Sequence, residues 1–341
     1  MRERPPTDAA GLPGLRGHVE AEWAAGVLTG YALLPDAALE AVEVTVNGTP
    51  AGRAEPGDRP DVATAYPAIP HAGRSGFRLS PPAGLLRVGE VNRVGVVGCR
   101  GGRPVARFGT VVFADALIPA TPVPPPALIE KVQGDRDAGA YRAVGFRYYH
   151  QLRDAVGRHR DPCGVRRLLD WGCGSGRVAA HFARSPGGPR VSGCDVDADM
   201  VEWCRGHVRS GEFDLIDCSA SLPYPDGAFD VVISLAVLAG FGPEAYPAWL
   251  AELRRVLAPD GLFVASVQGL LAASFELPPE GLARLRRDGI ADGGHGPGGW
   301  RGFYLTRDYV RREWARWFEV PEHREAEVNA DQDLIVARRV G

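Results

Sequence analysis

One stretch constrains this chain more than any other, the segment LLDWGCGSGR from Leu168 to Arg177. Apolar residues lead into Asp170, glycines then occupy every second position, and the helical run VAAHFA follows directly. Glycine tolerates a positive φ and lets a ligand approach the backbone closely. A helix that begins at such a turn presents free amide hydrogens and the positive end of its dipole, which favours an anion. The segment therefore predicts a buried parallel strand, a tight ligand-binding turn and the start of a helix.

The spacing of these residues distinguishes between the ligands that such a turn can hold. Dinucleotide oxidoreductases use the spacing G-x-G-x-x-G and hold a pyrophosphate there. Here the pattern is D-x-G-x-G-x-G, which resembles motif I of the class I S-adenosylmethionine-dependent methyltransferases. The methionine part of that cofactor carries an ammonium, which suits Asp170, and a carboxylate, which suits the amides around Gly172 and Gly174. A pyrophosphate has no use for an aspartate at that point, so the spacing disfavours the alternative of a nicotinamide-dependent oxidoreductase.

Length and composition indicate two globular domains and argue against some functions. The chain has 341 residues, of which 45% are hydrophobic, enough for two ordinary cores. A formal net charge of −3 gives no electrostatic case for a nucleic-acid partner. No stretch approaches about 18 consecutive apolar residues, so no membrane span is expected. The N-terminus lacks the apolar core of a secretory signal, and the six cysteines show no metal-binding spacing. We therefore expect a cytoplasmic protein with free thiols and no metal.

The texture of the chain divides it into four segments. Residues 1–15 are rich in Pro, Gly and charge and are expected to form a flexible tail. Residues 16–116 contain short alternating strands, with a hairpin signal at Asn47-Gly48, and indicate an all-β sandwich. Residues 59–79 are long for a hairpin loop and are a candidate crossing between its two sheets. The proline-rich residues 117–136 are interpreted as an extended linker, and residues 137–341 as the domain that holds the glycine turn.

The sandwich resembles small immunoglobulin-like modules that are joined to some bacterial sugar-processing enzymes. The resemblance rests on Arg59-Pro60-Asp61-Val62 and Ser75-Gly76-Phe77. Two roles stay open at this point: a packing module that forms a homodimer, or a module that binds glycans.

The resemblance to the methyltransferases also assigns cofactor contacts beyond the glycine turn. Asp195 ends the strand of RVSGCD and is the expected ribose ligand, because a carboxylate there accepts both hydroxyls. Its rival Asp197 suits a helix N-cap better. Met200 is expected one turn into the next helix, either against the adenine or in the core.

The adenine contact is ambiguous in this chain. In the family an acidic residue usually stands four places before the Leu-Pro of the next turn, and Cys218 occupies that place here. Either Asp217 reaches the adenine amino group, which we favour, or backbone groups near Cys218 do. The full set of expected cofactor-binding residues is Asp170, Trp171, Gly172, Cys173, Gly174, Gly176, Asp195, Val196, Met200, Asp217, Cys218 and Ser234.

The fold that this resemblance implies is α/β, a Rossmann-like sheet of seven mostly parallel strands with helices on both faces. Its last two strands are expected to form an antiparallel hairpin at one edge. A helix is predicted over residues 137–159, where Tyr141 or Tyr148 either touches the cofactor or packs in the core. Residues 270–303, with a short helix and a glycine-rich loop, follow the fifth strand and are expected to form a lid over the ligand-binding edge.

The sequence indicates the catalytic residues and the acceptor less clearly than it indicates the cofactor. A general base is needed only where the acceptor is protonated at working pH, as a hydroxyl would be. Many relatives carry a Thr-His-Leu-type segment where this chain has Ala239-Gly240-Phe241, so His295 in the lid is the one candidate base. Candidate substrate contacts are Trp300, Arg301 and Tyr304. The expected activity is O- or N-methylation of a small-molecule or glycan-linked acceptor, with a catalytically silent cofactor-binding protein as the other alternative.

Overall fold

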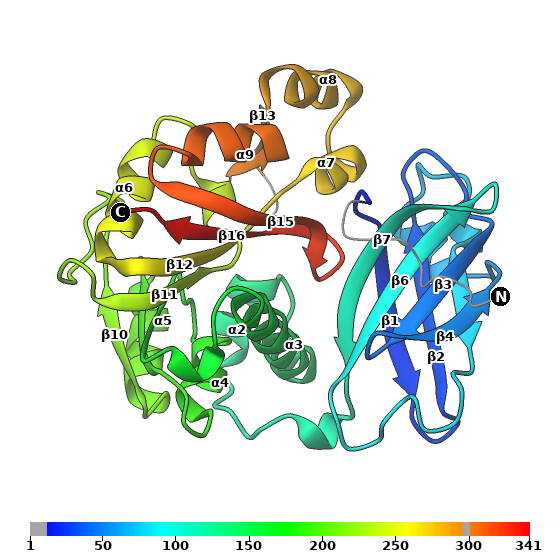
Figure 1. The fold of residues 1–341 in the computed structure, drawn as a ribbon, viewed down its shortest axis with the longest axis horizontal. Coiled ribbons are helices and arrows are strands. Elements are labelled where there is room, and N and C mark those ends of the chain that lie inside the picture. The colour runs from blue at the N-terminus through cyan, green and yellow to red at the C-terminus, as the bar shows by residue number, and fades with distance from the viewer. Residues whose placement is uncertain (1–11, 296–300) are drawn as a thin grey trace. The chain divides into compact units, whose positions relative to one another are not determined.

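The computed structural model describes residues 12–295 and 301–341, and the side chains of His295 and Arg301 are also outside the described part. Two compact units divide the chain. Unit 1 comprises the described residues up to Leu117 together with Arg324–Asp333, and unit 2 comprises Ile118–His323 together with Leu334–Gly341. Figure 1 shows β sheets in the N-terminal part and alternating strands and helices in the rest.

The centre of unit 2 is a sheet of seven strands, in the order β10-β9-β8-β11-β12-β16-β15. Their bounds are β8 (Arg167–Trp171), β9 (Arg190–Asp195), β10 (Gly211–Leu215), β11 (Phe229–Ser234), β12 (Leu257–Val267), β15 (Phe318–Val328) and β16 (Gln332–Arg339). Strands β8 to β12 pair in parallel. Residues 329–331 alone join β15 to β16, which is too short for a parallel crossover, so these neighbours run antiparallel.

Strand β8 is the parallel strand that the sequence predicts directly before Gly172. It lies between β9 and β11, with Leu168 opposite Val191 on one side and Val231 on the other. Successive side chains of a strand point to opposite faces, so Leu169 and Trp171 share one face while Leu168 and Asp170 share the other. The predicted α/β architecture of this part of the chain is confirmed.

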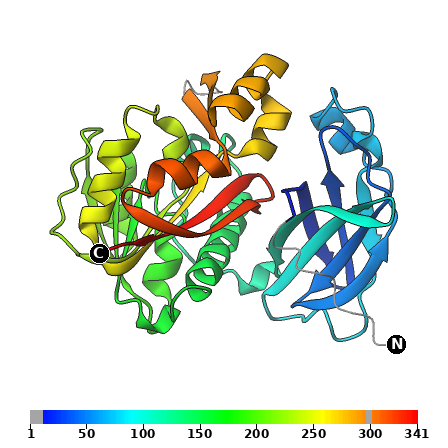
Figure 2. The same cartoon turned by 45° about the horizontal axis from the view of Figure 1, so that its top comes forward.

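Helices cover both faces of this sheet (Figures 1 and 2). The helices of unit 2 are α2 (Pro126–Gln133), α3 (Ala138–Gly157), α4 (Ala179–Arg184), α5 (Ala198–His207), α6 (Tyr246–Val256), α7 (Leu270–Glu276), α8 (Pro279–Asp288) and α9 (Arg307–Trp314), of which α7 and α8 belong to the segment that follows β12. Figure 1 shows α3 on one side of the sheet and α9 on the other. Trp249 of α6 and Trp314 of α9 are buried in one core with Leu169 and Phe263 of the sheet. The predicted amphipathic helices thus bury their apolar faces against the strands.

Helix α2 lies within residues 117–136, where the sequence analysis expects an extended linker. Pro125 is its N-cap and Pro126 is its first residue, a position that needs no amide hydrogen. Gly134 ends the helix in the left-handed conformation with φ 84. The expectation is wrong for residues 126–133, because these prolines start a helix and do not prevent one.

The predicted lid is more regular than the sequence suggests. It contains α7, the expected short helix α8, and an antiparallel pair of strands, β13 (Ile290–His295) and β14 (Arg301–Leu305). The register shifts between Asp292 and His295, where Gly294 has φ 77, so part of the expected glycine-rich loop is an irregular strand. The amide of Leu305 donates to the carbonyl of Gln268 at 2.8 Å, which ties β14 to the end of β12.

Unit 1 contains two β sheets around one core. Its strands are β1 (Arg16–Glu22), β2 (Val27–Leu33), β3 (Ala41–Val46), β4 (Thr49–Ala54), β5 (Gly76–Leu79), β6 (Asn92–Arg100) and β7 (Arg103–Val112). The sheet orders are β1-β2-β5 and β4-β3-β6-β7. Asn47 (φ 51) and Gly48 (φ 79) form the predicted hairpin turn between β3 and β4. Residues 59–79 include helix α1 (Pro60–Ala65) and cross from β4 in one sheet to β5 in the other, as expected.

The motif residues that suggest a sugar-processing module are packed within unit 1. The guanidinium of Arg59 lies 5.3 Å from the centre of the Tyr31 ring and binds both carboxylate oxygens of Asp61, at 2.8 and 2.7 Å. A Cβ on Gly76 would lie 2.5 Å from Cγ of Arg59, so only glycine leaves room for the arginine. Phe77 is buried in the core. These contacts give the motif a structural role inside the module.

Residues 324–333 also belong to unit 1. They comprise the end of β15, the connecting turn and the start of β16, and are called the hairpin tip here. Ala330 is part of the hydrophobic core of unit 1, and Asp331 forms an ion pair with Arg16. The Glu325 carboxylate accepts the amide of Gly14 at 3.1 Å. Unit 1 is therefore built from two distant parts of the chain, although the sequence analysis assigns residues 324–333 to the C-terminal domain.

Candidate functional site

The glycine turn after β8 adopts a conformation that other residues rarely reach. Gly172, Gly174 and Gly176 have φ values of 76, 52 and 76. A Cβ on Gly172 would lie only 2.1 Å from Cγ2 of Val237. The predicted tight turn is thus present, and both its backbone angles and its close neighbours require glycine.

Three amides of this turn donate to groups at the end of β9. Gly172 and Cys173 both donate to the carbonyl of Cys194, at 2.8 and 3.0 Å. The amide of Gly174 donates to Oδ2 of Asp195 at 2.7 Å. The turn is therefore fixed to the end of β9, and the expected carboxylate-binding amides of Gly172 and Gly174 are already engaged.

Asp170 is buried at the end of β8, beside this turn. The amide of Ala179, the first residue of α4, lies near its carboxyl group and favours its charged form. Burial, with a smaller contribution from the nearby charge of Asp195, raises the pKa of Asp170 to about 7. A cation beside Asp170 would favour its charged form again, which makes the site suitable for an ammonium group.

Asp197 is the N-cap of α5, as the sequence predicts, whereas Asp195 contacts the glycine turn. The carboxylate of Asp197 accepts the amides of Asp199 and Met200 and caps α5. Asp195 accepts the amide of Gly174 with one oxygen and the amide of Asp197 with the other, at 2.7 and 3.0 Å. Each oxygen of a carboxylate can accept a second hydrogen bond, so Asp195 keeps acceptor capacity for ligand hydroxyls.

Several expected cofactor residues turn their side chains into the core. Trp171 is fully buried, with its ring centre 5.9 Å from that of Phe241 and 4.8 Å from that of Trp249. Cys173 is also buried. Met200 is buried under the turn, with its sulfur 3.5 Å from the place of a Cβ on Gly174. The side chains of these residues therefore pack in the core around the turn.

Two large apolar side chains are exposed at the ends of neighbouring strands. Val196, directly after β9, is 46% exposed, and Leu215, the last residue of β10, is 50% exposed. Leu215 pairs with Asp195, so Asp195 has one of these apolar residues as its neighbour across the sheet and the other as its neighbour along the chain. The sequence analysis includes Val196 but misses Leu215, whose position at the end of β10 is the signal that could have indicated it.

The remaining expected cofactor residues differ in their surroundings. Asp217 is exposed and accepts the amide of Ser219 at 2.8 Å, and this bonding to Ser219 lowers the pKa of its carboxyl group. Cys218 is exposed. Ser234 is buried at the end of β11, and its hydroxyl has no hydrogen-bond partner within the described part of the chain. Since Ile233 pairs with Asp170, the hydroxyl of Ser234 lies at the same edge of the sheet as that carboxyl group.

Within the segment predicted to form a lid, Tyr304 joins two elements. Its hydroxyl donates to Oε2 of Glu276 at 2.5 Å, which joins β14 to α7. Its ring packs with Ala272 and Leu285 in the apolar core of the lid. The other lid candidates, Trp300 and the side chains of His295 and Arg301, lie outside the described residues.

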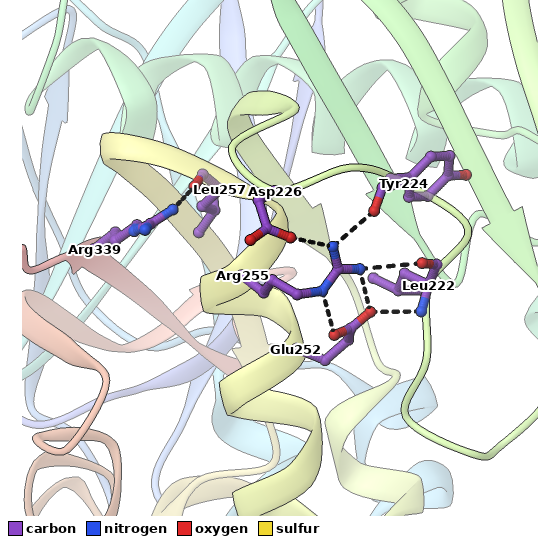
Figure 3. A network of polar contacts seen from close by, with 7 residues as sticks. All are labelled: Leu222, Tyr224, Asp226, Glu252, Arg255, Leu257 and Arg339. Carbon is purple, nitrogen blue, oxygen red and sulfur yellow. Dashed lines mark hydrogen bonds and ion pairs between the residues drawn. The ribbon is translucent and has the colours of Figure 1, made fainter.

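Arg255 of α6 fixes the loop that carries Asp217 to the sheet edge (Figure 3). Its guanidinium donates to the carbonyls of Leu222 and Tyr224, at 3.1 and 2.8 Å, and to the carboxylate of Asp226 at 2.7 Å. It also binds both oxygens of Glu252, at 2.8 and 2.7 Å. The predicted LPYPDGAFD turn is thus held by one side chain that satisfies several main-chain groups at once.

Replacing Arg255 by methionine is expected to destabilise unit 2 by roughly 2–3 kcal/mol, because the half-buried carboxylate of Glu252 loses its charged partner. Urea unfolding followed by circular dichroism measures this loss. The control is Arg190→Met, which breaks an exposed ion pair with Glu212 and should cost at most about 0.5 kcal/mol. Equal losses in both variants would contradict the role given to Arg255.

Comparison with known proteins adds an independent line of evidence. Residues 169–265 match the methyltransferase domain family. The matched segment begins in β8 and ends in β12, so it contains the glycine turn, Asp195 and the loop held by Arg255. The chain carries a methyltransferase domain of the S-adenosylmethionine-dependent class, and S-adenosyl-L-methionine is the cofactor of this domain.

Curated relatives share only part of the chain. A fatty-acid O-methyltransferase of Mycolicibacterium smegmatis is 31% identical over 35% of this chain and 42% of its own length. A demethylmenaquinone methyltransferase of Thermus thermophilus is 35% identical over 35% of this chain and 52% of its own length. A nocamycin O-methyltransferase of Saccharothrix syringae is 32% identical over 37% of this chain and 46% of its own length. The chain thus spans about half the length of the curated relatives that it matches.

A solved structure of a SAM-dependent methyltransferase from Methanosarcina mazei is 20% identical and covers 55% of this chain and 97% of that chain, with a TM-score of 0.44. Among the described residues, no helix has both the length and the apolar content that crossing a bilayer would require.

Proposed function

We propose that this protein methylates an oxygen or nitrogen atom of a small-molecule or glycan-linked acceptor. When bound, S-adenosylmethionine supplies a methyl group that is activated by the positive charge on its sulfur. The observation that carries the proposal is the pair of carboxyl groups at one sheet edge: Asp170 is buried beside the glycine turn, and Asp195 is fixed to the same turn. A buried acid with a raised pKa suits an ammonium, and a carboxylate with spare acceptor capacity suits vicinal hydroxyls.

The other parts of the cofactor have matching groups in this chain. Arg177 follows the last glycine of the turn and lies over the rings of Tyr141 and Tyr148, at 5.7 and 5.2 Å from their centres. Because the expected glycine amides are engaged, we assign the carboxylate of the cofactor to Arg177. Val196 and Leu215 provide apolar surfaces for the adenine ring, with Asp217 or groups near Cys218 for its amino group. Ser234 adds a hydroxyl at this edge that has no hydrogen-bond partner among the described residues.

For the transfer itself, this chain has to position the acceptor and exclude water. The lid formed by α7, α8, β13 and β14 follows the end of β12, so it is suited to cover the acceptor. Tyr304 and Glu276 keep two parts of this lid together. His295 stays the candidate base, and Trp300 and Arg301 stay candidate acceptor contacts.

Asp195→Ala is expected to weaken binding of S-adenosylhomocysteine by roughly 10- to 100-fold, since hydrogen bonds to a charged group are lost. Isothermal titration calorimetry measures the affinity, with Glu202→Ala, an exposed change on α5, as the control. A 2′-deoxy analogue separates ribose binding from loosening of the turn. The wild type should prefer the ribose form, while Asp195→Ala should bind both forms equally. A variant that keeps the preference would remove Asp195 from the ribose site.

The class of function is tested by binding and by turnover. Calorimetry with S-adenosylhomocysteine and with NAD separates a methyltransferase from a nicotinamide-dependent oxidoreductase. Screening acceptor pools with isotope-labelled S-adenosylmethionine separates a catalyst from a silent binding protein, which would label nothing. Labelled products that are lipids, quinones or other aromatic compounds, without any labelled saccharide, would contradict a glycan acceptor.

For unit 1 we propose a packing role and no glycan binding. Its motif residues Arg59, Asp61 and Gly76 are engaged in internal contacts, which favours a packing role over glycan recognition. We include an immunoglobulin-like unit 1, a homodimer and a cytoplasmic location in the proposal. Light scattering at several protein concentrations tests the dimer. Deletion of residues 1–116 is a poor test of acceptor recruitment, because it would leave the hairpin tip without the rest of unit 1.

A further inference from the structure

Helix α2 lies directly on the cofactor turn. Cγ2 of Val132 is 3.6 Å from the place that a Cβ on Gly174 would occupy. Leu128 and Ile129 of the same helix are buried, while Pro125 and Gly134 mark its two ends. A short, well-defined helical segment therefore covers the glycine turn.

Polar contacts connect this helix to both sides of the turn. Nζ of Lys131 binds Oδ2 of Asp197 at 2.8 Å and Oδ2 of Asp199 at 3.3 Å. Oε1 of Gln133 accepts from Arg177 at 3.4 Å. Asp197 and Asp199 belong to the start of α5, just beyond Asp195, whereas Arg177 belongs to the turn itself.

The Lys131 ion pairs differ in kind from the ion pair between Glu130 of α2 and Arg136. Arg136, just after the helix, binds Glu130 within the same segment of chain, at 2.8 Å. That pair stays intact however α2 moves. The Lys131 pairs must break if α2 leaves the turn, because they join it to α5. Lys131 is also the one lysine in the sequence, so its amine can be followed chemically without interference from other side chains.

We infer that α2 is a movable cover of the cofactor site and that Lys131 latches it to Asp197 and Asp199. The inference rests on the proposed function, since the ligand that the cover retains is the cofactor. Asp195 and Arg177, the groups assigned to ribose and carboxylate, flank the latch, so the cofactor leaves this side only when α2 moves. Lys131 is accordingly a positioning residue that controls how fast the cofactor exchanges.

The latch predicts faster dissociation of S-adenosylhomocysteine when Lys131 is replaced by methionine. Lys131 is 45% exposed, and such partly exposed pairs are weak, so the expected increase in the dissociation rate is about threefold to fivefold. Stopped-flow tryptophan fluorescence measures this rate. Added salt should speed dissociation from the wild type and leave the variant almost unchanged, because salt screens the ion pair.

Matched variants separate the latch from general effects on α2. Arg136→Met removes a cation from the same segment and should leave the rate unchanged, and Lys131→Arg should restore most of the slow dissociation. Asp199→Asn leaves α2 itself unaltered and should speed dissociation. Combined with Lys131→Met, it should add little, because both changes remove one interaction.

Amine labelling gives a second readout that does not depend on turnover. Acetylation of Lys131 by an exposed-amine reagent, followed by peptide mass spectrometry, should be slower with S-adenosylhomocysteine than without it. Unchanged dissociation in Lys131→Met, or acetylation that ignores the ligand, would overturn the latch while leaving the proposed function standing. A wild type that does not bind S-adenosylhomocysteine would overturn the proposed function and the latch together.

Discussion

Replacing Asp170 by asparagine is expected to make the ligand-free protein more stable at pH 8 and to remove most of its affinity for S-adenosylhomocysteine. Asparagine has the same shape and still places an oxygen near the amide of Ala179. It carries no charge, so it avoids the cost of burying a charge. For the same reason it does not attract the ammonium of the cofactor.

The pH dependence follows from the raised pKa of Asp170. In the folded protein its pKa is about 7, against an ordinary value of 3.8. The folded state therefore holds this proton more tightly, and the stability that the proton contributes is complete below about pH 4 and is lost as the pH rises through 7. The rise of the pKa from 3.8 to about 7 corresponds to a loss of roughly 4 kcal/mol in the free energy of unfolding at any pH above both pKa values. Burying the amide of asparagine offsets roughly half of this, which leaves a gain of about 2 kcal/mol at pH 8.

Thermal unfolding of the wild type and Asp170→Asn at pH 5 and pH 8 measures this effect. A gain of about 2 kcal/mol corresponds to a melting temperature higher by roughly 4–8 °C at pH 8, with little or no gain at pH 5. Calorimetry at pH 8 should show affinity for S-adenosylhomocysteine lower by at least roughly 100-fold. An equal gain at both pH values would mean that the charge of Asp170 is not the cause. Unchanged affinity would remove Asp170 from the ammonium site.

The local structure around the cofactor turn is predictable because short-range chemistry determines it. Apolar residues before Asp170 make a buried strand, three alternating glycines make a left-handed turn, and Asp197 caps the next helix. Each of these features depends on neighbours within a few residues along the chain, so the sequence pattern alone is sufficient.

The contacts that the sequence analysis misses depend on distant parts of the chain. The amides of Gly172 and Gly174 find partners at the end of β9, and no spacing rule indicates these partners. Helix α2 is hidden because its prolines suit a linker and a helix start equally well. The hairpin tip is hidden because nothing near Ala330 indicates that it packs among strands from the other end of the chain.

Among glycine-to-alanine substitutions in the cofactor turn, Gly172→Ala is expected to destabilise the protein most. The new Cβ would lie 2.1 Å from Cγ2 of Val237, and the backbone angle φ 76 strains any residue with a side chain. Strain of about 1 kcal/mol and overpacking of about 1–3 kcal/mol together predict a loss of roughly 2–4 kcal/mol in the free energy of unfolding. The shifted turn should also bind S-adenosylhomocysteine at least roughly 10-fold more weakly.

Two further variants divide this loss into its parts. Gly187 has a similar angle, φ 66, and nothing lies within 4 Å of its missing Cβ, so Gly187→Ala measures the backbone strain alone. Val237→Ala removes the methyl group that clashes, so Gly172→Ala combined with Val237→Ala should recover most of the overpacking loss in urea unfolding. If the double variant is as unstable as the sum of the two single variants, Val237 does not confine the turn. The close approach of these two residues would then not explain why glycine is required at position 172.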